Sequence, residues 1–179
     1  INDKYMNNWT TVMLAVKEKK PKIVKALLSN RFSRFDGINV KVDPEGWTAL
    51  LLAVHQDGID EKKKHEIVDA LLQEGADPNV YIISDENGNT AHDDATDVES
   101  SDDGNSDDDT ETNTVADGNM SKVTPLHIAA MRAEASIVKL LVDAGANVAL
   151  LGKDSNTSLH YAAIGGSVGA ARSIMNACD

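Results

Sequence analysis

One heptapeptide pattern occurs twice in the chain, with its first residues 33 positions apart. Residues 124–130 read TPLHIAA and residues 157–163 read TSLHYAA, and looser copies stand at residues 48–54 (TALLLAV) and 10–16 (TTVMLAV). Self-similarity at a period of this length indicates that each copy is one supersecondary unit, which must stack on its neighbours to bury its apolar face. The pattern therefore predicts a solenoid, and it favours a recognition surface over a catalytic pocket.

An apolar run follows each of the first three copies. Ile23 and Ile137 begin such runs 13 residues after the threonine of their unit, whereas Ile67 stands 19 residues after Thr48. Six residues are therefore inserted in that unit, around positions 59–64. Within the runs, apolar residues recur at i, i+1, i+3 and i+4, which predicts a helix whose apolar face is wide enough to be covered on two sides.

The ends of the predicted helices carry their own signals. Pro125 stands early in the first helix of its unit, where its missing amide donor costs nothing. Gly75 and Gly145 stand where a helix is expected to end in a left-handed residue. Each unit is thus predicted to be a helix–turn–helix closed by a turn that begins with glycine, followed by an extended finger such as residues 79–81.

The opening phrase, the spaced second helix and the closing turns GADPNV (75–80) and GANV (145–148) together resemble the ankyrin repeat. The resemblance covers most of the chain outside one long insert. It implies an all-α fold: an α-solenoid of about four stacked helix–turn–helix repeats with short finger loops. It also implies that His127 and His160, which occupy the same place in two repeats, are structural residues that form hydrogen bonds near the start of the first helix.

The repeats and the insert divide the chain into five segments, and the terminal repeats depart from the family pattern. Because the chain begins with Ile1 rather than Met and stops at Asp179, inside or just after the last helix, we interpret it as a segment of a longer protein. The predicted segments are 1–45 (repeat 1, divergent, in the place of an N-terminal cap), 46–84 (repeat 2, with a six-residue insertion between its helices), 85–120 (an acidic disordered insert), 121–153 (repeat 3) and 154–179 (repeat 4, divergent or truncated).

The negative charge of the chain belongs to the insert. Residues 85–120 contain 13 acidic residues and no Lys or Arg, so removing them changes the net charge from −12 to +1. The segment is rich in Asp, Ser, Thr, Asn and Gly and nearly free of bulky apolar residues, so it cannot bury enough surface to offset its ordering entropy. We expect a disordered acidic loop at the finger between repeats 2 and 3.

Motifs that mimic catalytic or metal sites are better explained by the repeats. Residues 165–169 (GGSVG) match the nucleophile elbow of hydrolases, but that elbow needs a strand before Ser167 and a helix after it, whereas here two helices are predicted. The three histidines outside the repeated phrase show no metal-ligand spacing with each other or with the single cysteine. The sequence therefore predicts no enzyme activity, no cofactor and no metal site.

Composition narrows the setting. Cys178 is the single cysteine, which excludes an intrachain disulfide and favours a reducing compartment. No apolar stretch approaches the roughly 18 residues needed to span a bilayer. Phosphate repels an acidic chain, which disfavours nucleic acid as a partner. We therefore expect an intracellular protein, cytoplasmic or nuclear, or else an effector delivered to a host cytosol, and a monomer as an isolated segment.

The candidate partner-binding residues follow from the resemblance, because fingers and first helices line a concave face in ankyrin-like stacks. The residue before the motif threonine projects from the finger, and tryptophan there offers a large, stiff contact area. The alternative is that each tryptophan only packs on the neighbouring finger. The residues before the threonines are Trp9, Trp47, Val123 and Asn156, and the candidates at or near the ends of the first helices are Lys17, Lys19, His55, Gln56, Met131 and Arg132.

Two interpretations of the basic run from Lys17 to Lys25 stay open. It is either a solvated outer turn of a capping repeat or a patch for an acidic partner, for instance the chain's own insert. Taken together, the sequence predicts a non-catalytic scaffold or adaptor module that recognises another protein. The alternative is a regulatory or targeting arm of a larger enzyme or channel whose activity lies outside this chain.

Overall fold

The structure, a computed structural model, describes residues 9–29, 38–42, 46–84 and 121–178. The predicted acidic disordered insert lies outside these described residues. The described residues form α1 (Thr11–Lys17), α2 (Pro21–Ser29), α3 (Ala49–His55), α4 (Glu61–Gln73), β1 (Ile82–Ser84), β2 (Ser121–Val123), α5 (Pro125–Met131), α6 (Ala135–Asp143), the short 3-10 helix η3 (Lys153–Ser155), α7 (Ser158–Ile164) and α8 (Val168–Met175).

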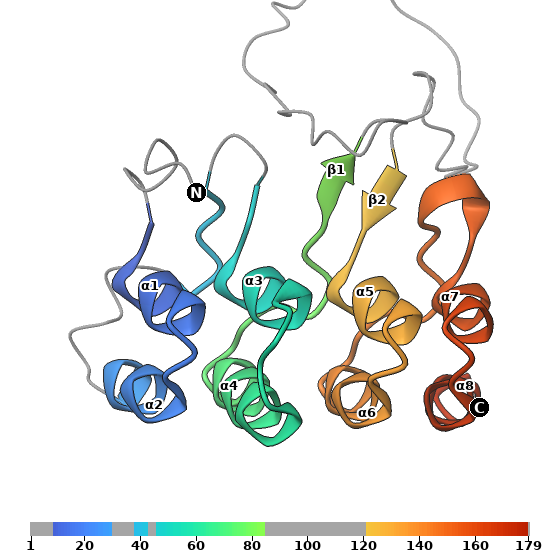
Figure 1. The fold of residues 1–179 in the computed structure, drawn as a ribbon. Helices are drawn as coiled ribbons and strands as arrows, with labels where there is room; N and C mark the ends of the chain where they lie inside the picture. Colours follow the sequence, from blue (N-terminus) through green and yellow to red (C-terminus); the bar gives the residue numbers. More distant parts are fainter. Residues whose placement is uncertain (1–8, 30–37, 43–45, 85–120, 179) are drawn as a thin grey trace, which may run out of the picture.

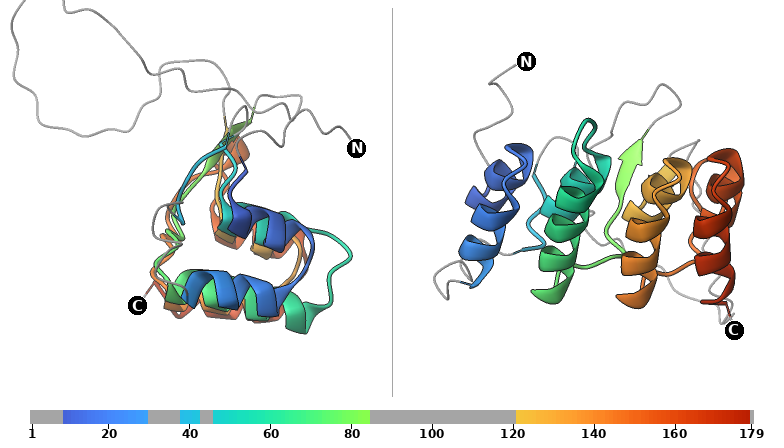
Figure 2. Two further views of the ribbon diagram at one scale, coloured as in Figure 1. Left: turned by 90° about the vertical axis from the view of Figure 1, so that its left-hand side faces the viewer. Right: turned by 60° about the horizontal axis from the view of Figure 1, so that its bottom comes forward.

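The α-helices are arranged as four pairs that stack side by side (Figure 1). The first helices α1, α3, α5 and α7 form one layer, and the second helices α2, α4, α6 and α8 form another. The segments between pairs extend away from both layers as fingers, so that each pair with its finger has the outline of an L when viewed along the stack (Figure 2, left). The predicted all-α solenoid of about four repeats is confirmed. Each helix pair lies within one predicted repeat segment, whose boundaries stay predictions.

The motif threonine explains where each first helix begins. Thr10, Thr48 and Thr124 are the N-cap residues of α1, α3 and α5, and each hydroxyl accepts a hydrogen bond of 3.2–3.3 Å from the backbone N–H three residues later. These N–H groups have no acceptor inside the helix, so without the threonine hydroxyl they would lack a hydrogen bond within the helix. Thr157 occupies the same N-cap position at α7.

The core lies between the two layers and between neighbouring pairs. Ile137, Val138 and Leu141 of α6 are fully buried, and so are Ala129 and Ala130 of α5. The small alanine side chains allow α5 to approach its neighbours closely, and α5 packs directly on α3, α6 and α7. The burial of one apolar face by the next pair is the stacking that the sequence period requires.

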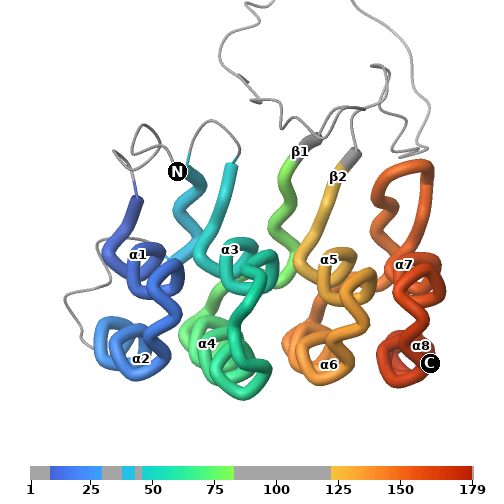
Figure 3. The backbone as a smooth tube through the Cα atoms, in the orientation of Figure 1, coloured from blue at the N-terminus to red at the C-terminus, as the bar shows by residue number. Residues whose placement is uncertain are grey.

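The inserted residues of the second pair lengthen both its turn and its second helix. Five residues separate α3 from α4, whereas three separate the helices of each other pair. The longer connection between α3 and α4 can be followed in the tube of Figure 3. Helix α4 has 13 residues and α6 has 9, so two inserted residues lie in the turn and four extend the helix. Asp60 caps this extension by accepting a hydrogen bond of 3.2 Å from the Lys63 N–H.

The finger between the second and third pairs is a two-stranded antiparallel ribbon. Ile82 pairs with Val123, and Ser84 pairs with Ser121. Ser84 and Ser121, the described residues on either side of segment 85–120, are therefore paired neighbours. The prediction of short finger loops did not include these strands, because three-residue segments carry too little alternation to be recognised.

In two of the fingers an asparagine bonds to the glycine turn of the next pair. Asn79 donates its Nδ2 hydrogen to the Gly145 carbonyl at 3.2 Å and accepts from the Asn147 N–H at 2.7 Å. Asn39 makes the same two bonds one repeat earlier. These bonds satisfy backbone groups of the glycine turn and fix the spacing of successive pairs.

Candidate recognition surface

Two positions recur at the two ends of every first helix: the residue before the N-cap threonine and the last helical residue. In the first two pairs these side chains reach each other along the helix. The Lys17 Nζ lies 5.2 Å from the ring centroid of Trp9, and the ring centroids of Trp47 and His55 are 5.0 Å apart. The two positions therefore share one face. We call this face the first-helix surface, and its residues are Trp9, Lys17, Trp47, His55, Val123, Met131, Asn156 and Ile164.

The N-terminal half of the first-helix surface is aromatic and basic. Trp9 and Trp47 are half-buried and pack against the core, so each presents only part of its ring to solvent. Trp47 is also held by its backbone, which exchanges hydrogen bonds of 2.9 and 3.2 Å with Val42 in the preceding finger. Rings fixed in this way lose little entropy on contact with a partner, and an ammonium above an indole adds a cation–π contact.

The C-terminal half of the first-helix surface is apolar and more open. The side chain of Met131 is 48% exposed and that of Ile164 is 67% exposed. Val123, on β2, and Asn156 are half-buried. Ile164 was missed as a candidate, although its position seven residues after Thr157 matches that of Met131 after Thr124. The sequence signal was therefore present in the period.

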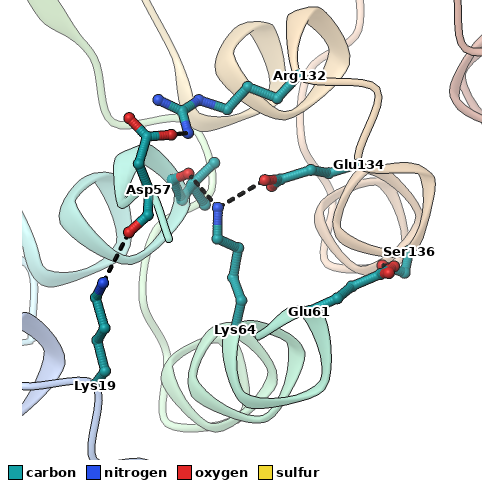
Figure 4. Close-up of polar contacts among 8 residues, drawn as sticks. Lys19, Asp57, Glu61, Lys64, Arg132, Glu134 and Ser136 are labelled. Atoms are coloured by element: carbon teal, nitrogen blue, oxygen red, sulfur yellow. Dashed lines mark hydrogen bonds and ion pairs between the residues drawn. The ribbon is translucent and has the colours of Figure 1, made fainter. Parts of the chain in front are cut away.

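Three of the predicted contact residues connect neighbouring pairs, and Figure 4 shows two of them, Lys19 and Arg132. The Lys19 Nζ donates to the carbonyls of Asp57 and Gly58 at 2.8 and 3.2 Å. Arg132 forms an ion pair with the exposed Asp57 carboxylate, and this guanidinium holds the pKa of Asp57 below its usual value. Gln56 donates its Nε2 hydrogen to the Lys17 carbonyl at 2.7 Å, so its amide group also joins the second pair to the first. The turn of the second pair thus lies between its two neighbours and is bonded to both.

A buried ion pair in the same region was not predicted. Lys64 on α4 is only 4% exposed, and its Nζ lies 2.7 Å from the Glu134 Oε1 and 3.1 Å from the Val54 carbonyl. Glu134 precedes α6 and is 21% exposed. The pair joins the second and third helix pairs across an interface that the sequence separates by the whole insert. Residues 70 positions apart carry no local signal of such a contact.

A second unpredicted feature lies on the fingers. The ring centroid of Tyr81 is 5.1 Å from the Lys41 Nζ and 5.1 Å from the Lys122 Nζ. Beside it is a shallow cavity of ≈ 310 Å³, lined by Asn79, Tyr81, Lys122, Thr124, Asn147 and Leu150. Two ammonium groups beside one ring add positive charge to the finger, which suits contact with acidic groups of a partner.

The repeated histidines have the structural role that the resemblance implied. The His127 Nε2 lies 3.0 Å from the Leu150 carbonyl, which only accepts, so Nε2 carries the hydrogen. Its Nδ1 then accepts from the Thr124 N–H at 3.3 Å. The His160 Nδ1 accepts from the Thr157 N–H at 3.2 Å in the same way. Burial lowers the pKa of His127 below its ordinary value of 6.5, opposed in part by the carbonyl bond.

This lowered pKa predicts a pH-dependent stability. His127 binds a proton less readily in the folded chain than in the unfolded chain, so its neutral form contributes to the free energy of unfolding. This contribution is complete above about pH 6.5 and is lost as the pH falls towards the folded pKa. The slope due to one proton is at most about 1.4 kcal/mol per pH unit. Urea unfolding between pH 7.5 and 5 should show this slope in the unsubstituted chain and in His160→Gln, but not in His127→Gln. An equal slope in all three proteins would contradict the assignment.

The glycine-rich pentapeptide 165–169 joins α7 to α8, two helices, and not a strand to a helix. Ser167 is the N-cap of α8: its Oγ accepts from the Ala170 N–H at 3.2 Å and donates to the Ala133 carbonyl at 3.5 Å. A nucleophile elbow needs the serine exposed on a strained strand-to-helix turn. The hydroxyl is used here to start a helix and to contact the preceding pair.

Within the described part of the chain, no group of three or more His, Cys, Asp or Glu side chains is placed to hold a metal ion. Over the same residues, none of the helices combines the length and the apolar character that crossing a membrane requires.

The comparison with known families agrees with this geometry. A family model described as ankyrin repeats (3 copies) matches residues 1–82 and 104–179. A search of curated proteins found no significant match. The matched segments include all eight α-helices of the described residues, the capping threonines and the glycine turns. The chain belongs to the ankyrin-repeat family.

Proposed function

We propose that this chain is a non-catalytic scaffold or adaptor module that recognises another protein through its first-helix surface and its fingers. Ankyrin repeats are generally protein–protein interaction modules, and solenoids of this kind bind partners on extended concave surfaces. Within this proposal the partner is an intracellular protein, met in the cytoplasm or nucleus, and the chain binds it as a monomer.

One observation carries the proposal: the same two positions recur in all four pairs, and stacking buries none of these eight residues completely. Met131 and Ile164 are large apolar side chains that remain 48% and 67% exposed. Trp9 and Trp47 present part of their rings at the equivalent ends of the first two pairs. Interface hot spots are enriched in such aromatic residues when they are held in place by their surroundings.

The charge distribution suggests how a partner is oriented. Lys17 and His55 occupy the positions that Met131 and Ile164 occupy in the other two pairs. A partner segment with acidic groups over the first two pairs and apolar groups over the last two would match both halves. Such matching fixes the direction of binding more than its strength.

Replacing Trp9 and Trp47 together by alanine should weaken binding by more than about 2 kcal/mol, the size expected for hot spots. Affinity is measured by titration calorimetry with the partner that the chain captures, and thermal unfolding of the variant is measured alongside. Met131→Ala with Ile164→Ala serves as the second variant, because these exposed side chains contribute little to the fold. Normal binding by both variants would contradict the proposal, whereas unfolding of the tryptophan variant alone would mean that Trp9 and Trp47 act in packing.

The acidic segment 85–120 is proposed to modulate this recognition by charge. It carries 13 acidic residues, and the strands on either side of it pair with each other in one finger. If it competes for basic residues of the module, deleting it should tighten binding of an acidic partner; if it recruits, deletion should weaken binding of a basic one. Both effects should shrink in high salt, since exposed charges are screened beyond about 10 Å at 0.1 M.

Deletion of this segment should change stability little. A hairpin turn joining Ser84 to Ser121 keeps the register of β1 and β2, and the cost of closing a loop grows only with the logarithm of its length. The melting temperature should therefore stay the same or rise slightly in a scanning calorimeter. A large decrease would show that the segment contributes to the stack.

The rival function is a regulatory or targeting arm of an enzyme or channel whose activity lies outside this chain. It uses the same recognition surface, and the full-length reading frame decides between the two. A kinase signature, a cluster of membrane spans or a further catalytic domain beside the repeats would favour the rival.

A further inference from the structure

The outer face of the last helix pair has the composition of a covered interface. We call this face the end face. Its residues lie on α7 and α8, each 33 positions after a residue of α5 or α6 that contacts the last pair. Helix α5 packs on α7 and α6 packs on α8. The end face is the next surface of that kind in the stack, and it lies at the end of the molecule that carries α7 and α8 (Figure 2, right).

On the first helices, residues that are covered in the third pair are open in the fourth. Leu126 is 1% exposed, but the corresponding Leu159 is 38% exposed. Ala130 is fully buried, whereas the corresponding Ala163 is exposed. The residue types are conserved between the pairs although their burial differs, so α7 retains an apolar face that it does not use against α5.

The second helices show the same difference. Val168 and Met175 of α8 are 73% and 51% exposed, while the corresponding Ala135 and Val142 of α6 are half-buried under the fourth pair. Contact at this interface is tight, because a Cβ placed on Gly169 of α8 would lie 2.9 Å from the Ala135 Cβ. Two large apolar side chains on the end face thus occupy positions that the preceding interface covers.

The hydrogen bonds of the repeated histidine give independent evidence. His127 uses Nδ1 to bond Thr124 and Nε2–H to bond the Leu150 carbonyl, which belongs to the finger leading into the next pair. His160 makes the same Nδ1 bond to Thr157, but among the described residues its Nε2 has no hydrogen-bond partner. The end face therefore presents an imidazole donor at the place where the preceding interface supplies a finger carbonyl.

We propose that the end face is a stacking surface for a further ankyrin-type repeat. Leu159, Val168 and Met175 pack on its two helices, and the His160 Nε2–H donates to a carbonyl of its finger. The occupant is identified by continuity with the interface between the third and fourth pairs, since the apolar positions and the histidine donor repeat together. An unrelated apolar partner would account for the exposed side chains but not for the position of the histidine.

The test adds one repeat of known sequence to the chain. A second copy of residues 144–178 placed after Asn176 continues the 33-residue register and supplies a finger and a helix pair. Hydrogen exchange of the original α7 and α8 amides should slow at least tenfold relative to the unextended chain, and the His160 Nε2–H should become visible by NMR. Val168→Lys should abolish the slowing in the extended chain and change nothing in the unextended one, because this side chain is 73% exposed.

Arg172→Glu is the matched control, since the corresponding Lys139 stays exposed in the covered third pair, and it should preserve the slowing. Unchanged exchange on extension, or a slowing that Val168→Lys leaves intact, would overturn the proposal. Sedimentation of the unextended chain tests whether the end face binds a second copy of the chain instead. If the chain dimerises and Val168→Lys dissociates the dimer, the end face binds a second copy and the proposal is wrong.

Discussion

Replacing Lys64 by alanine should destabilise the chain by about 3 kcal/mol. The substitution removes the ammonium that lies 2.7 Å from the Glu134 Oε1 and 3.1 Å from the Val54 carbonyl. The Glu134 carboxylate would then remain mostly buried without its cation, and its Oε2 already has no hydrogen-bond partner among the described residues. Breaking a buried pair from one side costs more than the pair itself contributes, because the remaining charge is uncompensated.

Urea unfolding measures this decrease in the free energy of unfolding, and two further variants serve as controls. Lys63→Ala removes a neighbouring lysine that is exposed, so it should change the free energy of unfolding by less than about 0.5 kcal/mol. Lys64→Met combined with Glu134→Leu replaces both charges and should recover most of the loss. If Lys64→Ala costs no more than Lys63→Ala, the pair does not hold the second and third helix pairs together.

Gly165→Ala should also cost about 3 kcal/mol, near the upper end for overpacking. A Cβ at Gly165 would lie 2.5 Å from the Met131 carbonyl oxygen and 2.7 Å from that of Ala130. These are backbone atoms at the end of α5, where the Ala130 carbonyl accepts from the Ala133 N–H at 3.1 Å. They cannot withdraw without disturbing the end of that helix, so α7 must move away from α5.

The adjacent glycine provides the matched control. Gly166 has φ +70°, yet a Cβ there would meet nothing within 4 Å. Gly166→Ala should therefore cost only the strain of a left-handed alanine, about 1–2 kcal/mol, and Ala133 already adopts φ +59° at the corresponding turn. Thermal or urea unfolding should rank Gly165→Ala as the more damaging change. The reverse order would mean that backbone conformation, and not the approach of α5 to α7, selects the glycines.

The sequence predicted the parts of the fold that repeat. Thr10, Thr48 and Thr124 marked the starts of the first helices because a hydroxyl at an N-cap serves the same backbone N–H each time. The apolar runs marked the second helices, since their spacing places residues such as Val24, Ile67 and Ile137 in the core. Four of the candidate surface residues, Trp9, Lys17, Trp47 and His55, do come together in two pairs.

The features that break the period could not be predicted. Lys64 belongs to an insertion, and its partner Glu134 lies across the acidic segment, so neither position signals the other. Lys19, Gln56 and Arg132 share the composition of surface residues, but three-dimensional contacts between turns use their side chains. Exposure itself is also non-local: the fourth pair covers Leu126, which is 1% exposed, whereas the equivalent Leu159 of the fourth pair is 38% exposed.

Hydrogen exchange with and without the bound partner tests the proposed recognition surface most directly. The bound partner should slow exchange in the first helices α1, α3, α5 and α7 and in the finger residues beside them. The second helices α2, α4, α6 and α8 should exchange at their unbound rates, because they form the opposite layer. Protection confined to the second helices, with the first helices unchanged, would contradict recognition through the first-helix surface.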